Sequence, residues 1–224
     1  METLLQIKKT KKKKKGVFIS FEGGEGVGKS TQINLLKENL TNNKFKVVCT
    51  REPGGTKEAE HLRKLLVTGE KQAWDPNSES LIFNAIRREH INKIILPAIE
   101  CGSIVLCDRF VDSTIVYQGI VGEVNEIDLF ELHRKYCYNL FPDITFFLDL
   151  PSQKGLKRAL KRQNTIENRF ENLGINYHQK ILNGFDILQK KNPNRIIRIN
   201  ADKTKEHISY EIGSYIKKLL NTND

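Results

Sequence analysis

The chain has 224 residues, which is enough for one domain with a sizeable buried core. With 38% hydrophobic and 29% charged residues it resembles a globular protein, and no stretch approaches the ~20 apolar residues of a membrane span. The net charge of +10 is uneven, because seven lysines against one acid give residues 1–15 a charge of +6 and leave +4 for the remainder. Such a run typically marks a disordered, solvated tail, so nucleic-acid binding is not expected; a weak arm for nucleic acid or acidic lipid is the alternative.

A phosphate-binding pattern follows this tail. Residues 17–21 are a nearly continuous apolar run, typical of a buried parallel strand. Residues 23–30 then fill the pattern G-x-x-x-x-G-K-[ST], and a helix is predicted over 30–42. Glycines let successive backbone N–H groups point at phosphate oxygens, Lys29 can reach the β- and γ-phosphates, and the Ser30 hydroxyl can bind Mg²⁺. The sequence therefore predicts a nucleoside triphosphate site.

Strand and helix patterns alternate through the rest of the chain. Further strands are predicted over residues 46–50, 103–107, 144–150 and 195–199. Helices are predicted over residues 57–67, 78–100, 125–140, 152–162, 170–191 and 203–220, with Pro97 as a candidate kink and 111–120 as helix or loop. This alternation predicts an α/β fold in which a five-stranded parallel sheet is flanked by helices.

Three charged loops follow predicted strands: the P-loop, residues 51–56 (REPGGT), and Asp108 with Arg109. Ligands of open parallel sheets bind at the carboxyl ends of the strands, so these loops are expected to meet in one crevice. Asp108 could anchor Mg²⁺ through water. Its neighbour is an arginine rather than a second acid that would position a hydrolytic water, and no guanine-reading N-K-x-D motif is present, so a G-protein switch is not expected.

Arginines are abundant near the predicted crevice: Arg51, Arg63, Arg87, Arg88, Arg109, Arg158, Arg162 and Arg169. Guanidinium groups suit the planar, spread charge of phosphates, and one nucleotide does not need so many. A second phosphorylated substrate, and phosphoryl transfer between the two anions, would explain them. A surface salt bridge is the competing interpretation for each single arginine, most of all for Arg88.

The four cysteines, Cys49, Cys101, Cys107 and Cys137, form no C-x-x-C pair, and five scattered histidines have no metal-ligand spacing. We therefore expect a reduced, cytoplasmic protein with neither disulfides nor a zinc site. Cys49 and Cys107 lie in apolar, strand-like runs, where a cysteine is usually a small buried hydrophobe.

The chain resembles the thymidylate kinase family from residue 17 to about residue 215. The resemblance rests on FEGGEGVGKST (21–31), REPGGT (51–56), LIFNAIRREH (81–90), DRFVDSTIVYQG (108–119), PDITFFLDL (142–150) and NRFE (168–171). It implies a P-loop nucleoside monophosphate kinase-like fold, with one kinase domain over 16–224 and a lid at about 158–170. It also implies a Mg²⁺-dependent enzyme that transfers the ATP γ-phosphate to dTMP, giving dTDP and ADP in dTTP biosynthesis, and a homodimer packed through helices.

The resemblance also implies roles for individual residues. The ATP site would comprise Gly23, Gly24, Glu25, Gly26, Val27, Gly28, Lys29, Ser30, Thr31 and Arg158, with Mg²⁺ at Ser30 and Asp108. The dTMP site would comprise Glu25, Glu52, Pro53, Arg63, Phe83, Arg87, Arg109, Thr114, Tyr117 and Gln118. The catalytic residues would be Lys29, Glu52, Arg109 and Arg162.

Within that acceptor site the family pattern is specific. Phe83 would stack on thymine, Arg87 would donate to a base carbonyl, and Gln118 would read a ring nitrogen. Without the motif, Phe83 would be interpreted as simple core packing. Tyr117 would lie under the deoxyribose and leave no room for a 2′-hydroxyl, while Glu25 would meet the 3′-hydroxyl.

One departure from some relatives is informative. Some family members carry an arginine inside the P-loop, at the position of Gly26 in this chain. Members that lack it, as this chain does, are expected to supply an arginine finger from the lid instead. Arg162 matches that finger best, with Arg158 and Arg169 as neighbours.

Two other functions stay open. One is a kinase for another nucleotide such as dUMP, since one methyl group in a pocket discriminates between substrates only ~10–200-fold. The other is a non-catalytic nucleotide sensor or nucleic-acid binder.

Overall fold

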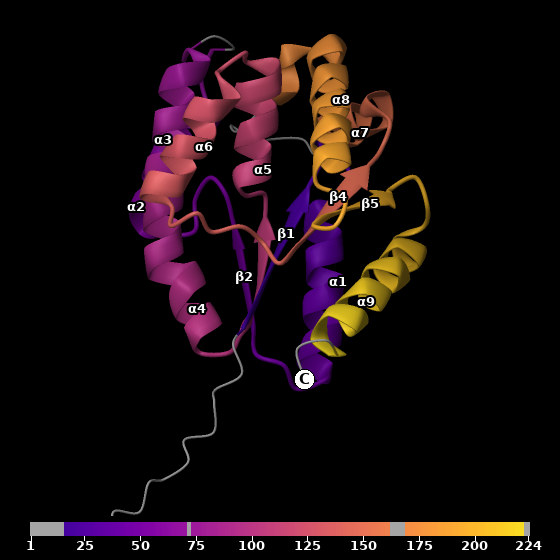
Figure 1. Ribbon diagram of the computed structural model, residues 1–224. Coiled ribbons are helices and arrows are strands. Elements are labelled where there is room, and N and C mark those ends of the chain that lie inside the picture. The colour runs from indigo at the N-terminus through magenta and orange to yellow at the C-terminus, as the bar shows by residue number, and fades with distance from the viewer. Residues whose placement is uncertain (1–15, 71–72, 162–168, 222–224) are drawn as a thin grey trace, which may run out of the picture.

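The computed structural model describes residues 16–70, 73–161 and 169–221. Its centre is a five-stranded parallel sheet in the order β2-β3-β1-β4-β5 (Figure 1). The strands are β1 (Val17–Glu22), β2 (Val47–Arg51), β3 (Ile104–Asp108), β4 (Ile144–Asp149) and β5 (Ile196–Asn200). The predicted α/β fold is confirmed, and the P-loop strand β1 lies in the middle of the sheet, between β3 and β4.

Helices connect the strands and cover both faces of the sheet (Figure 1). They are α1 (Lys29–Asn42), α2 (Lys57–Val67), α3 (Pro76–His90), α4 (Leu96–Glu100), α5 (Val111–Thr114), α6 (Glu126–Tyr136), α7 (Ser152–Leu160), α8 (Ile175–Lys191) and α9 (Lys205–Asn221). Two π-helical segments, Ile91–Ile95 and Ile115–Val121, continue α3 and α5, and a short 3₁₀ turn spans Glu171–Leu173. No helix of the described residues is long and apolar enough to cross a membrane.

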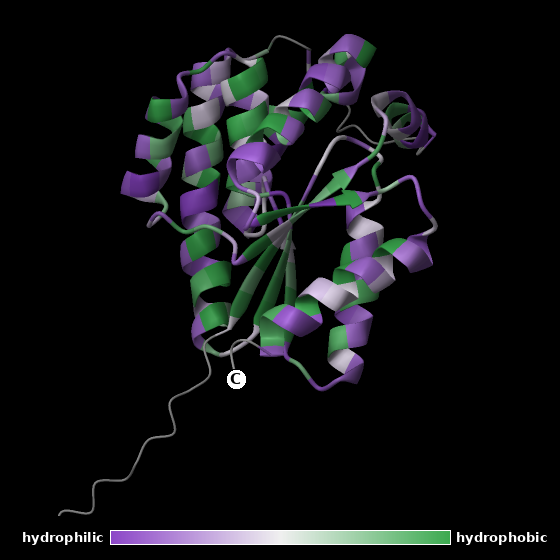
Figure 2. Cartoon of the chain, turned by 45° about the vertical axis from the view of Figure 1, so that its right-hand side comes forward, coloured by the Kyte–Doolittle hydropathy of each residue, from purple (hydrophilic) through white to green (hydrophobic). Residues whose placement is uncertain are grey.

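Alternation along β1 builds a core on each side of the sheet. Val17, Ile19 and Phe21 face the core closed by α1 and α9, whereas Phe18 faces the core closed by the α3–α4 segment and α8. Figure 2 shows the green, apolar strands enclosed by helices of mixed colour. Burial on both faces explains why β1 is a continuous apolar run rather than an alternating one. These two cores fix the sheet, and with it the carboxyl ends of its strands.

Several element boundaries differ from the prediction. The helix predicted over 78–100 contains a π-helical segment just before Pro97, which places this proline in the first turn of α4, where its missing N–H costs little. The helix predicted over 170–191 starts only at Ile175, because Gly174 (φ +85°) interrupts it.

The cysteines differ in part from the prediction. Cys107 is buried as expected, but Cys49 is exposed, since β2 is an edge strand of the sheet. Residues 1–15, predicted as a tail, lie outside the described residues.

Candidate active site

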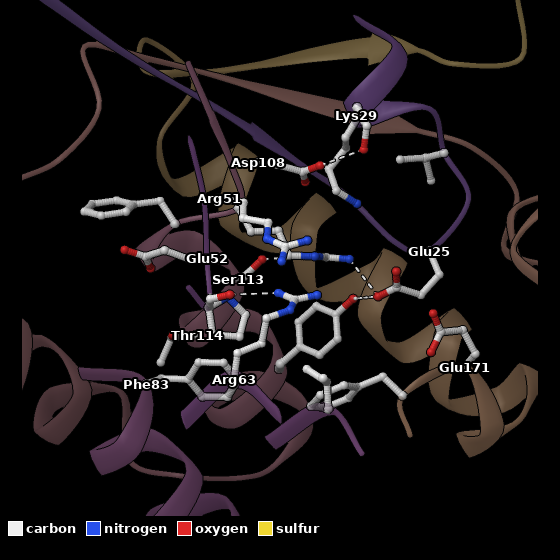
Figure 3. Close-up of a pocket in the computed structure, with 18 of the residues that line it drawn as sticks. Glu25, Lys29, Arg51, Glu52, Arg63, Phe83, Asp108, Ser113, Thr114 and Glu171 are labelled. Atoms are coloured by element: carbon white, nitrogen blue, oxygen red, sulfur yellow. Dashed lines mark hydrogen bonds and ion pairs between the residues drawn. The ribbon is translucent and has the colours of Figure 1, made fainter. Parts of the chain in front are cut away.

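One pocket of about 260 Å³ lies where the loops after β1, β2 and β3 meet α3 and the α5 segment (Figure 3). Most of the predicted site residues line it: Glu25, Gly26, Val27, Gly28, Lys29, Ser30, Glu52, Pro53, Arg63, Phe83, Arg87, Asp108, Arg109, Thr114, Tyr117 and Gln118. The three charged loops therefore converge, as the strand order requires. The volume approaches that of typical small-ligand sites.

The P-loop curls around the amino terminus of α1. Gly26 and Gly28 have φ angles of +67° and +102°, which favour glycine, and α1 begins directly after Gly28. The Lys29 ammonium donates to the carbonyls of Gly24 (2.9 Å) and Gly23 (3.3 Å). Free N–H groups of the first helical turn and the lysine thus face the same end of the pocket, which is the arrangement that binds phosphate groups.

Close packing explains the glycine at position 26. A Cβ atom there would lie 2.1 Å from the carbonyl oxygen of Gly155 in α7 and 3.0 Å from the Ala159 nitrogen. Gly155 itself packs against the P-loop, because a Cβ atom on Gly155 would lie 2.5 Å from the Glu25 carbonyl oxygen. The absence of a side chain at Gly155 therefore lets α7 lie directly on the P-loop. An arginine at position 26 would require α7 to move away.

Two side chains whose oxygens could bind a metal ion, Ser30 and Asp108, meet beside the P-loop. The Ser30 hydroxyl donates a 2.9 Å hydrogen bond to the Asp108 carboxylate at the end of β3. Hydroxyl, carboxylate and water oxygens are the ligands that Mg²⁺ prefers, and Mg²⁺ usually keeps several waters. These two side chains therefore fit the predicted magnesium position, and the described residues contain no cluster of three or more His, Cys, Asp or Glu side chains that would hold a metal unaided.

Arg109 bridges the P-loop and the α5 segment. Its guanidinium donates to Glu25 at 2.7 Å and to the Ser113 hydroxyl at 3.1 Å, and it lies over the Tyr117 ring. Tyr117 also donates to Glu25, at 3.2 Å. Burial would raise the pKa of Glu25, but Arg109 and Lys29 outweigh it and lower that pKa to about 2. Glu25 is therefore a carboxylate at neutral pH, and it orients Arg109.

A buried glutamate that sequence analysis missed, Glu22, supports the turn at Arg109. Glu22 accepts hydrogen bonds from the Phe110 N–H (2.7 Å) and from the Ser113 hydroxyl (2.6 Å). Arg109 itself has φ +69°, an unfavourable value for a residue other than glycine, and these bonds fix the turn that requires it. Burial, and secondly Asp112, raise the pKa of Glu22 to about 8. Glu22 is part of the FEGGEG motif, but only its burial reveals this role.

A second buried network holds Glu52, from the REPGGT loop. Its carboxylate accepts from Arg87 at 2.8 Å and from His90 Nδ1 at 3.0 Å, and all three side chains are at most 3% exposed. Burial would raise the pKa of Glu52, but chiefly Arg87, and then His90, lower it. Arg87 also donates to Thr114 at 2.7 Å. Its Nη1 atom is fully buried and has no hydrogen-bond partner among the described residues, so one side of this guanidinium is left unpaired there.

Aromatic and amide groups form the far end of the pocket. Phe83, Tyr117 and Phe170 line it, with Gln118 among them, and the Tyr117 and Phe170 rings meet edge to face at 5.8 Å. Arg63 lines the same region and donates to the Pro53 carbonyl at 2.8 Å. A slot lined by aromatic rings and a few polar groups suits a heteroaromatic ring.

Some predicted residues lie elsewhere. Gly23, Gly24 and Thr31 belong to the P-loop but do not line the pocket, and Arg158 is exposed on α7. Arg162 lies outside the described residues. Arg88 turns to the surface, where it donates to the Tyr136 carbonyl and lies over the Tyr138 ring. Arg169 is buried and paired with Glu79, so it is not a free guanidinium facing the crevice.

These features define a class of protein. The P-loop lies on the central strand of a parallel sheet, beside two oxygens suited to Mg²⁺, and the other half of the pocket has arginines and an aromatic slot. This combination is typical of P-loop kinases that act on small phosphorylated substrates. The sheet order and the helices on both faces match the nucleoside monophosphate kinase-like fold that the sequence predicts.

Comparison with known proteins gives the family. The family profile "Thymidylate kinase" matches residues 21–212. A thymidylate kinase of Caulobacter vibrioides is 40% identical over 205 residues, which cover 92% of this chain and 98% of that protein. One from Bradyrhizobium sp. (strain ORS 278) is also 40% identical, over 93% of this chain and 92% of that protein. The chain belongs to the thymidylate kinase family and is therefore a kinase.

A solved structure agrees with this assignment. The crystal structure of thymidylate kinase from Ehrlichia chaffeensis superposes with a TM-score of 0.73 at 35% sequence identity, covering 90% of this chain and 99% of that chain. The relatives are thus matched almost end to end, and the span matched by the family profile, residues 21–212, contains every residue that lines the pocket.

Proposed function

We propose that the chain carries out the reaction of its family, the transfer of the γ-phosphoryl group from ATP to dTMP to give dTDP and ADP, in dTTP biosynthesis. The observation that supports this most directly is the composition of one pocket. It joins a P-loop to an aromatic slot in which Phe83, Arg87 and Gln118 lie together. Residues from 16 onward would work as a single kinase domain.

The donor nucleotide would occupy the P-loop end. Backbone N–H groups of residues 23–31 and the Lys29 ammonium would hold the ATP phosphates, with Lys29 exchanging its two carbonyl contacts for phosphate oxygens. Ser30 and, through water, Asp108 would hold Mg²⁺, which supplies charge neutralisation when bound. Arg158 at the end of α7 would reach the same nucleotide.

The acceptor would occupy the other end, with its base in the slot. Phe83 would stack on thymine, Arg87 would donate to a base carbonyl through Nη1, which has no partner among the described residues, and Tyr117 would support the sugar. Five side chains would surround the sugar and phosphate: Glu25, Glu52, Pro53, Arg63 and Thr114. Arg109, between the two ends, would bind the acceptor phosphate and offset the repulsion between the two anions.

The chemistry needs no general base of tuned pKa, because the attacking group is already an anionic phosphate. What the protein must supply is alignment and positive charge at the transferred group. Lys29 and Arg109 point into the pocket, and Arg162, from the predicted lid, is the third proposed cation. Glu52 contributes by fixing Arg87 and the REPGGT loop.

Product analysis tests this proposal. Incubation with Mg²⁺-ATP and dTMP is expected to give equal amounts of ADP and dTDP, separated by ion-exchange chromatography. Excess EDTA should abolish the reaction, because the metal-free phosphates lose their charge neutralisation, and added MgCl₂ should restore it. ADP without dTDP would indicate hydrolysis and contradict the transfer.

The proposal includes a homodimer. The helices α2, α3 and α6 lie next to one another (Figure 1), and each of them carries exposed apolar side chains. They are Leu62 and Leu65 on α2, Leu81 on α3, and Ile127 and Phe130 on α6, of which Ile127 is 70% exposed. Burying such a patch against a second copy would remove it from water.

Light scattering during size-exclusion chromatography checks this. We expect a mass near 52 kDa for the wild type, twice the 25.8 kDa chain, and a monomer for the double variant Leu65→Glu/Leu81→Glu, because buried charges oppose association. Tyr210→Glu, at an 81% exposed position on α9, is the control and should stay dimeric. A monomeric wild type at micromolar concentration would refute the dimer.

A further inference from the structure

A buried carboxylate behind the pocket carries an inference that rests on the proposed function and goes beyond it. Glu79 lies in the first turn of α3 and does not itself line the pocket. One carboxylate oxygen accepts from the Arg169 guanidinium at 2.5 Å, and the other accepts from Gln118 Nε2 at 2.8 Å. The side chains of Glu79 and Arg169 are 8% and 3% exposed, so this chain of contacts is shielded from water.

Arg169 is held by several hydrogen bonds, and it fixes which groups donate and which accept in the contacts from Arg169 through Glu79 to Gln118. Its guanidinium also donates to the carbonyls of Leu66 (2.9 Å) and Glu70 (3.2 Å), and its N–H donates to the Val67 carbonyl (3.2 Å). A guanidinium can only donate. The Glu79 oxygen that faces Arg169 must therefore be an acceptor, and the remaining oxygen is left for Gln118.

The same reasoning fixes the Gln118 amide. The two ends of a carboxamide have nearly the same shape, so their orientation is decided by their hydrogen-bond partners. A carboxylate accepts, so Gln118 must turn its NH₂ group toward Glu79. Gln118 lies in the pocket wall, and its planar amide then directs the carbonyl oxygen away from Glu79. That oxygen accepts no hydrogen bond from the described side chains.

We propose that Glu79 is a positioning residue for base selection: by fixing the Gln118 amide, it makes the pocket present a hydrogen-bond acceptor to the base. Thymine and uracil carry N–H at ring position 3 and can donate to it. Cytosine has an unprotonated nitrogen there, so acceptor would face acceptor. Selection between these bases then depends on a residue that does not touch the nucleotide.

The isosteric variant Glu79→Gln tests the proposal. Arg169 still requires an acceptor, so the carboxamide introduced at position 79 would turn its own NH₂ group toward Gln118. Two NH₂ groups cannot pair, and the Gln118 amide should rotate and present its NH₂ group to the base. We expect kcat/KM for dTMP to fall about 10- to 100-fold, the cost of an unpaired buried donor, and the dTMP to dCMP preference to fall by a similar factor.

Two comparisons separate orientation from general damage. The dTMP to dUMP ratio should stay within about twofold of the wild type, because the two bases present the same edge and a distorted slot would alter the fit of the methyl group. The double variant Glu79→Gln/Gln118→Glu should have a kcat/KM for dTMP at least tenfold higher than that of Glu79→Gln alone. The amide at position 79 would then donate to the carboxylate at position 118, whose second oxygen again offers an acceptor to the base.

Each outcome decides the question. Loss of dTMP preference with rescue in the double variant supports the positioning role. Unchanged selectivity in Glu79→Gln, or an equal loss for dTMP, dUMP and dCMP without rescue in a protein that still melts cooperatively, overturns it and leaves Glu79 a structural residue. Absence of dTMP turnover in the wild type would instead contradict the proposed function.

Discussion

Replacing Arg109 with alanine is expected to lower kcat for dTMP phosphorylation about 100-fold, the typical effect of deleting one preorganised charged donor. Arg109 is the cation that lies between the P-loop and the acceptor slot, held by Glu25 and Ser113 and stacked on Tyr117. Without it, the phosphates of donor and acceptor would repel each other with less compensation, and the acceptor would lose a ligand. Steady-state kinetics with saturating Mg²⁺-ATP measure both kcat and the KM for dTMP.

Two controls make this result specific. Arg198→Ala removes an exposed guanidinium that pairs with Asp149 and Asp186, outside the pocket lining, and should leave turnover within about twofold. Arg109→Lys keeps the charge but not the planar fork and should fall between wild type and alanine. Circular dichroism should show an unchanged fold. Near-normal kcat/KM in a folded Arg109→Ala protein would contradict the role assigned to Arg109.

Replacing Arg87 with leucine is expected to lower the free energy of unfolding by about 3–5 kcal/mol, the cost of leaving a buried charge without its partner. Arg87 is 1% exposed and donates to the equally buried Glu52 at 2.8 Å. After the substitution, His90 would be the one remaining donor to that carboxylate among the described side chains. Urea denaturation, followed by fluorescence or circular dichroism, gives the free energy directly.

The neighbouring arginine provides the matched control. Arg88→Leu removes a guanidinium whose contacts within the described part of the chain are a surface carbonyl and an exposed tyrosine ring, and should cost less than about 1 kcal/mol. The double variant Arg87→Leu/Glu52→Gln should regain at least half of the loss, because no unpaired carboxylate is left. If Arg87→Leu and Arg88→Leu were equally stable, the buried pair would not be the stabilising element that its geometry suggests.

The architecture of the sheet could be predicted from the sequence because its signals are local. The apolar run at β1, the P-loop and the alternation of strands and helices give the fold, and the loops at strand ends give the crevice. The boundaries that failed depend on tertiary packing. Nothing local indicates the π-helical segment 91–95, and Gly174 interrupts a helix whose periodicity continues across it.

The pocket lining was predicted partly from the loops at the strand ends and partly from the family resemblance, whereas the groups that support it were not predicted. Phe83 and Gln118 were identified through family motifs, whereas Glu22, Glu79 and His90 act behind the pocket walls. A glutamate on a predicted helix is usually a solvated charge, and only the structure shows that Glu79 is buried between Arg169 and Gln118. Gly155 shows the same limit, since its contact with the P-loop spans 129 residues from Gly26.

The central claim is that the second half of the pocket selects dTMP, and parallel kinetics test it most directly. Coupled ADP-release assays with Mg²⁺-ATP and dTMP, dUMP, dCMP, dGMP or AMP give kcat/KM for each acceptor. We predict that dTMP has the highest value, with dUMP lower by about 10–200-fold, the discrimination that one methyl group allows, and purine nucleotides lower still. A purine nucleotide or dCMP used better than dTMP would contradict the assignments of Phe83, Arg87 and Gln118.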